Sequence, residues 1–227
     1  MTNRTKSNIE DRFLKDTHNH VMTILCDEGN TRSLLFKDPT CSYYYFRITT
    51  WEGHLCISGD MGTYVFSRTS DMFNFFRMDK EKPLNINPGY WHEKLVAEDC
   101  QNKSKGFSAE LFNEVTKEYF ENYCDDNCES EETKARIWKS IEENLLCSGG
   151  EREEEMREIV EDSSWVEYDD HEGEQQDFAD SLKIDFWEES FQDYSLHYIW
   201  ILYAIVWAIK QYDAHKASQL EQTKVEE

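Results

Sequence analysis

The chain has 227 residues, of which 47 are acidic and 24 are basic, and its formal net charge at pH 7 is −23. Such an excess of negative charge repels phosphates, so it excludes a protein that binds nucleic acid or anionic membranes by general electrostatic attraction. Aromatic residues make up 14% of the chain, which is enough to build a core and excludes a wholly disordered acidic protein.

The first third of the chain predicts an antiparallel meander of four or five strands. Short runs of aromatic and β-branched residues alternate with turn residues at a spacing of about eight to twelve residues. We expect strands at residues 21–26, 33–37, 42–50, 55–58 and 63–67. Ser70 or Asp71 can then cap a short helix over 72–76.

The remainder of the chain predicts helices. We expect a short helix over 89–97, a helix capped by Ser108 that runs to residue 123, and a third helix over 130–146. Residues 151–160 are helix-prone, and residues 161–176 have the polar, acidic and Gly-containing composition of a mobile loop. The last helix should cover about 194–217.

The last helix is apolar nearly all round in its first half, so it should lie at the centre of the fold. Its apolar run covers only residues 196–209, whereas a bilayer span needs about 20 residues. Together these patterns predict an α+β fold: an N-terminal antiparallel β-meander packed against C-terminal helices, with a highly acidic helical or loop insertion. We expect a β-rich part, 1–107, and an acidic helical part, 108–227, in one compact unit.

Nearly all the charge imbalance lies in one stretch. Residues 1–107 carry 14 basic and 14 acidic side chains, whereas residues 121–193 carry 6 basic and 26 acidic ones. On a helix, residues four apart lie about 6 Å apart along the axis, so clustered carboxylates form a row of fixed negative charge. Such a row can imitate the phosphates of DNA for a DNA-binding protein. The alternative is a solvated acidic face or a disordered segment.

We expect the partner-binding residues to be acids of this stretch together with the aromatic residues among them: Glu151, Glu153, Glu154, Glu155, Glu158, Glu161, Asp162, Trp165, Glu167, Tyr168, Asp169 and Asp170. Aromatic rings are rare in purely solvating tails. Exposed rings can serve as interface anchors. The same rings, together with Trp138, Phe178, Phe186 and Trp187, can instead attach the acidic segment to a core.

Several stretches carry a resemblance: TWEGHLCISGDMGTYVFSR at 50–68, residues 70–76, residues 86–95, and HYIWILYAIVWAIKQYD at 197–213. They resemble a family of uncharacterised proteins carried by bacteriophages, prophages and plasmids. The resemblance implies a bacterial cytoplasm and an accessory role in a mobile element, and it supplies no catalytic residues. With the charge, it predicts a non-enzymatic inhibitor whose partner is a basic host protein, either a DNA-binding protein or a nuclease of a defence system.

Two other functions stay open. In the first, aromatic residues of the sheet stack a base while two arginines hold a phosphate; the residues are Tyr43, Tyr45, Trp51, Tyr64, Arg47 and Arg68. In the second, acids around Asp60 and Asp99 form the centre of a metal-dependent nucleic-acid enzyme, although most such Gly-Asp turns are structural. A homo-oligomer is compatible with every reading.

Recognisable catalytic and metal-binding motifs are absent. The chain has no Walker A loop, Rossmann glycine fingerprint, G-x-S-x-G elbow or H-E-x-x-H sequence. The seven cysteines are scattered, and Cys124 and Cys128 lack the second short-spaced pair of a structural zinc site. We therefore expect no catalytic residues, metal or cofactor, and free thiols in a reducing cytoplasm.

Overall fold

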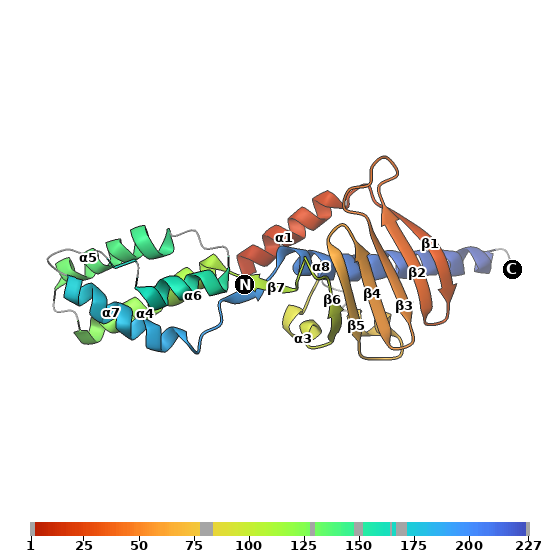
Figure 1. Ribbon diagram of the computed structural model, residues 1–227. Coiled ribbons are helices and arrows are strands. Elements are labelled where there is room, and N and C mark those ends of the chain that lie inside the picture. Colours follow the sequence, from red (N-terminus) through yellow and green to blue (C-terminus); the bar gives the residue numbers. More distant parts are fainter. Residues whose placement is uncertain are drawn as a thin grey trace. The chain divides into compact units, whose positions relative to one another are not determined.

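The computed structural model describes residues 3–77, 84–127, 130–147, 152–163, 165–166 and 172–225. The chain divides into two compact units (Figure 1). The sheet unit contains Met1–Lys105 and Tyr194–Glu227, and the helical unit contains Gly106–Asp193. The sequence analysis grouped the last helix with the acidic residues in the part 108–227 and placed it at the centre of the fold. The structure groups this helix with the sheet unit, and the helical unit is a continuous segment between the two stretches of the sheet unit.

The sheet unit is built on six antiparallel strands in the order β1-β2-β3-β4-β5-β6, which confirms the predicted α+β meander. The strands are β1 (Val21–Glu28), β2 (Thr31–Lys37), β3 (Phe46–Trp51), β4 (His54–Gly59), β5 (Gly62–Ser67) and β6 (Leu95–Glu98). Gly53 and Gly62 adopt positive φ angles of 72° and 99° in the tight turns that flank β4. Glycine reaches such angles without steric cost, which favours these reversals.

The sixth strand lies where we predicted a helix over 89–97. Only α3 (Pro88–His92) is helical there, with Asn87 as its N-cap and Pro88 in its first turn. The following residues pair with β5, and Phe66 lies opposite Leu95. The prediction was wrong because β6 is stabilised by backbone hydrogen bonds to the edge of β5. This pairing is not visible in the local sequence of residues 89–97.

One face of the sheet is covered by helices. Along β2 to β5, alternate residues point inward and are fully or almost fully buried: Leu34, Phe36, Phe46, Ile48, Leu55, Ile57, Tyr64 and Phe66. They pack in one core with α8 (Leu196–Val225), α1 (Asn3–Asp16) and α2 (Met72–Phe76). Figure 1 shows α8 running across the strands. Its first half is buried on nearly all sides, as its apolar sequence predicts.

A buried arginine joins two strands to two helices. The guanidinium of Arg32 on β2 donates two hydrogen bonds to Asp71, at 2.9 and 3.2 Å, and lies 4.6 Å from the ring centre of Phe73. Asp71 also accepts from the backbone N–H of Phe73 and so caps α2. Beside this pair, the hydroxyl of Tyr212 on α8 donates to Asp27 on β1 at 2.7 Å. Burial raises the pKa of Asp71, but its bonds to Arg32 and Phe73 lower the pKa more.

The helical unit has a separate aromatic core. Its helices are α4 (Ala109–Asn127), α5 (Glu131–Ser140), the π-helical continuation η1 (Ile141–Leu146), α6 (Glu153–Asp162) and α7 (Glu172–Phe186). Their buried face includes Phe112, Phe120, Ile137, Ile141, Leu145, Met156, Val160, Trp165, Phe178, Leu182 and Phe186. Ser108 accepts from the backbone N–H of Leu111, which confirms its predicted role as an N-cap. Ser130 accepts from the backbone N–H of Thr133 and caps α5.

The region predicted as a loop, 161–176, is partly helical. Residues 161–162 complete α6 and residues 172–176 begin α7, while 164 and 167–171 lie outside the described residues. Strands β7 (Lys105–Phe107) and β8 (Gln192–Tyr194) pair as a separate two-stranded sheet where the chain passes between the units. Among the described residues, no helix has the combination of length and apolar composition that a bilayer span requires.

We predict that Asp71→Asn lowers the free energy of unfolding of the sheet unit by about 3 kcal/mol, because it removes the carboxylate that hydrogen-bonds to the buried Arg32 guanidinium and leaves only Asp27, 4.0 Å away, to balance its charge. Asparagine is as good an N-cap as aspartate, so the capping contribution is retained. The matched control is Asp213→Asn, which breaks the exposed ion pair with Arg77 and should cost less than about 1 kcal/mol. Urea unfolding measures both changes, and equal losses would contradict the role assigned to Arg32.

Candidate functional site

The negative charge of the protein is concentrated in the helical unit. Residues 106–193 contain 29 acidic and 7 basic side chains, a net charge of −22, whereas the sheet unit contains 18 acidic and 17 basic ones. The described helices of this unit share a buried aromatic core. The acids on these helices are therefore attached to a folded backbone, in contrast to those of a disordered acidic tail.

Helix α6 carries six of the predicted binding residues. Met156 and Val160, four residues apart, are buried against the core. Acids occupy six of the other eight positions of the helix, so burial of one narrow apolar stripe turns most of the carboxylates outward. The six acids are Glu153, Glu154, Glu155, Glu158, Glu161 and Asp162.

Two of these six carboxylates are engaged in ion pairs. Glu153 lies 2.7 Å from the guanidinium of Arg157, accepts a hydrogen bond from Gln192, and its side chain is only 15% exposed. Glu155 pairs with Arg152, whose Nε donates to it at 2.8 Å. These two residues therefore contribute less to the surface charge than the sequence suggests.

The other four acids form the acidic ridge, which we define as Glu154, Glu158, Glu161 and Asp162. All four are exposed, and none of them is in an ion pair within the part of the chain that the structure describes. The ridge spans eight residue steps, or about 12 Å of helix axis, so its charges average about 4 Å apart along that axis. One strand of duplex DNA carries a charge about every 3.4 Å.

A second row of acids on α4 was missed in the sequence analysis. Phe112, Thr116, Phe120 and Cys124 form its buried stripe. The exposed acids at three- and four-residue spacings are Glu110, Glu114, Glu118, Glu121 and Asp125. Glu121 pairs with Lys117 at 3.8 Å. The sequence did indicate this row, since its glutamates lie four residues apart in the predicted helix. The count of charges began at residue 121, however, and therefore left out Glu110, Glu114 and Glu118.

Trp165 does not lie on the surface. It is 2% exposed, and its ring packs edge-on against Phe178 at 6.1 Å between centroids. Phe178 and Phe186 are buried in the same core. These rings hold the helical unit together, which supports the alternative that we left open for them. Trp187 is different, because it is 80% exposed. The remaining predicted residues, Glu151, Glu167, Tyr168, Asp169 and Asp170, lie outside the described residues.

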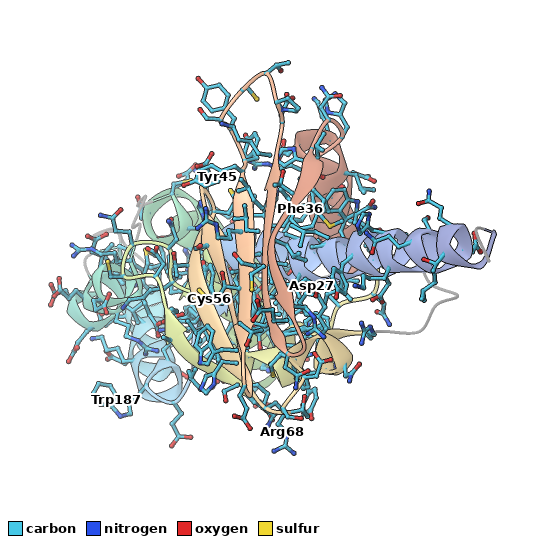
Figure 2. All side chains as sticks on the ribbon, turned by 90° about the vertical axis from the view of Figure 1, so that its right-hand side faces the viewer. Asp27, Phe36, Tyr45, Cys56, Arg68 and Trp187 are labelled. Carbon is cyan, nitrogen blue, oxygen red and sulfur yellow. The ribbon has the colours of Figure 1, made fainter. Side chains whose placement is uncertain are left out.

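The sheet does not assemble the residues of the proposed nucleotide site. Tyr64 is fully buried on the inner face, and its hydroxyl donates to the carbonyl of Asn102, whereas Arg47 is exposed on the outer face. Tyr45 and Arg68 lie at opposite ends of the sheet (Figure 2). Trp51 is the last residue of β3, whereas Tyr45 directly precedes the first. The two residues are therefore about 20 Å apart along an extended strand.

The acids of the proposed metal centre stabilise turns. Asp60 accepts from the backbone N–H of Tyr44 at 2.7 Å, and Asp99 accepts from those of Gln101 and Asn102 at 2.9 and 3.0 Å. These backbone bonds lower the pKa of Asp99. Within the described ranges, no group of three or more His, Cys, Asp or Glu side chains is arranged to hold a metal ion.

A polar cluster that the sequence analysis did not identify lies beside α3. The Nε2 atom of His92 is 3.1 Å from Oγ of Ser104, and Ser104 donates to Glu98 from both its hydroxyl and its backbone N–H. In a Ser-His-acid triad, the acid orients the histidine. Here the acid binds the serine, and Ser104 is 3% exposed, so the cluster closes the 98–104 loop and has no accessible nucleophile.

Comparison with protein-family models, with curated proteins and with solved structures finds no match to this chain. The interpretation of the acidic surface therefore depends on its charge and geometry.

We predict that Trp165→Ala destabilises the helical unit by about 3 to 5 kcal/mol, because it removes a large buried ring from the core. Trp187→Ala is the matched control: its ring is exposed, so the change in stability should stay within about 0.5 kcal/mol. Hydrogen exchange followed by mass spectrometry resolves the two units, and protection should fall in 106–193 only for Trp165→Ala. Unchanged exchange in that variant would contradict the assigned core position.

We also predict that the sheet unit loses stability as the pH falls below about 6.5. Burial and the nearby charge of Lys105 lower the pKa of His92, so the unfolded chain binds a proton that the folded unit does not. Stability from this group is complete above the unfolded pKa and is lost as the pH falls toward the folded pKa. In His92→Gln, the urea midpoint should change less between pH 7.5 and pH 5.5. Identical pH dependence in both proteins would exclude His92 as a contributor.

Proposed function

We propose that this protein is a non-enzymatic inhibitor from a bacterial mobile element such as a phage. In the cytoplasm of the host, the acidic surface of the helical unit occupies the basic DNA-binding site of a defence or DNA-processing protein. The observation that supports this proposal is the concentration of a net charge of −22 in one folded unit, with exposed carboxylates on its helices.

The electrostatics of the helical unit suit such a role. Fixed charge of one sign steers an oppositely charged partner over distances near the Debye length, about 10 Å at 0.1 M salt. Like charges four residues apart destabilise a helix. The helical unit retains several such pairs, including Glu154 with Glu158 on α6 and Glu114 with Glu118 on α4. These glutamates weaken the helices that carry them, so their presence supports a role for them at an interface.

The proposed partner normally binds duplex DNA. Competition between DNA and the acidic surface for that partner is therefore the most direct test. The purified protein, immobilised on a resin, should retain basic proteins from a bacterial lysate at about 0.05 M salt and lose them as the salt concentration rises. A short duplex DNA in excess should release the same proteins at constant salt. Retained proteins that duplex DNA does not displace would contradict the mimicry.

We predict that replacing the acidic ridge by Glu154→Gln, Glu158→Gln, Glu161→Gln and Asp162→Asn together reduces retention of the DNA-displaced proteins by about tenfold, because four interface charge pairs are lost at once. The matched control changes four exposed acids of the sheet unit: Asp11→Asn, Glu28→Gln, Glu52→Gln and Glu221→Gln. It alters the net charge by the same amount and should retain the proteins as wild type does. Equal loss in both variants would show that only total charge matters.

A further inference from the structure

A groove lies between α6 and α7 at the edge of the acidic ridge. Its volume is about 130 Å³, it is partly open to solvent, and its lining comprises Arg157, Val160, Glu161, Lys183, Phe186 and Trp187. Trp187 follows directly after α7, and its indole is 80% exposed. Figure 2 shows this side chain pointing outward from the helices. With most of its surface exposed, this indole contributes little to packing and is available to a partner.

The walls of the groove are held in place by Arg157. Its guanidinium pairs with Glu153 on α6 and donates to the backbone carbonyls of Phe186, at 2.5 Å, and of Glu189. These carbonyls lie at and just after the C-terminus of α7, where helical carbonyls have no partner within the helix. The contact fixes the end of α7, and therefore the start of the segment that carries Trp187, against α6.

Of the three charged side chains that line the groove, only an acid is available to pair with a partner. Arg157 is already paired with Glu153, and Lys183 lies 3.1 Å from Asp180. Glu161 is exposed and is in no ion pair among the described residues. The groove thus combines apolar surface from Val160 and Phe186, one aromatic face and one carboxylate that is available for pairing.

We propose that this groove binds an arginine side chain of the basic partner; the inference rests on the proposed function and names the contact by which the acidic surface recognises that partner. The methylene stem of the arginine covers Val160 and Phe186, the guanidinium stacks on the indole of Trp187, and Glu161 neutralises its charge. Arginine fits better than lysine because its planar, weakly hydrated head stacks on aromatic rings. A neutral apolar side chain would gain nothing from the charge of Glu161.

The test measures binding of two labelled peptides, octa-arginine and octa-lysine, to the full chain by fluorescence anisotropy at fixed salt. Both peptides have the same charge, so the ratio of their affinities isolates the arginine-specific contact. Trp187→Ala should reduce the arginine-over-lysine ratio by about fivefold and leave the affinity for octa-lysine nearly unchanged. Trp187→Phe retains an aromatic face and should lose less of the preference.

The matched control is Trp51→Ala, which removes a 40% exposed tryptophan from the nearly neutral sheet unit and should leave the ratio as in wild type. A ratio that is unchanged in Trp187→Ala, or that falls equally in Trp51→Ala, overturns the inference. The proposed function has a separate readout in the retention of DNA-displaced proteins by the ridge variant. If the ratio falls while that variant retains its proteins, the arginine site stands and the proposed function fails.

Discussion

Mutual repulsion between carboxylates is the constraint that the fold of the helical unit must overcome. An excess of 22 negative charges in one unit opposes its compaction, and the opposing contribution comes from a core rich in aromatic side chains. Local ion pairs such as Glu153–Arg157 relieve part of the repulsion. The sheet unit uses charge differently, because Arg32 and Asp71 are paired and largely buried. The protein therefore separates charge that determines packing from charge that is presented to solvent.

Much of the sheet unit could be predicted from its sequence because its signals are local. The strands alternate apolar and polar residues, and glycines at 53 and 62 mark the reversals. Two elements escaped prediction because their stability comes from distant residues. Strand β6 forms by pairing with β5. Helix α1 carries few apolar residues, and Phe13 is buried by packing against rings of α8, among them Trp200 and Trp207, whose centroids lie 5.0 and 6.0 Å away.

The candidate site was predicted less completely, since a charge count locates acids along the chain but does not reveal their environments. Glu153 and Glu158 are indistinguishable by composition, yet one is paired and the other is exposed. Trp165 and Trp187 both lie among acids, and only the packing of the helices decides that the first is buried and the second exposed. The acids of α4 could have been identified from their three- and four-residue spacing in the predicted helix. That spacing would have extended the candidate site toward residue 110.

Strands β7 and β8 lie side by side, so the chain enters and leaves the helical unit at adjacent points. A segment whose ends meet in this way can be exchanged for another of different length with little strain on the protein that hosts it. The acidic unit is thus an insertion whose length and sequence can change without altering the order of the strands in the sheet unit. Under the proposed function, a change of target requires substitutions within residues 106–193 alone, since the sheet unit has a separate core.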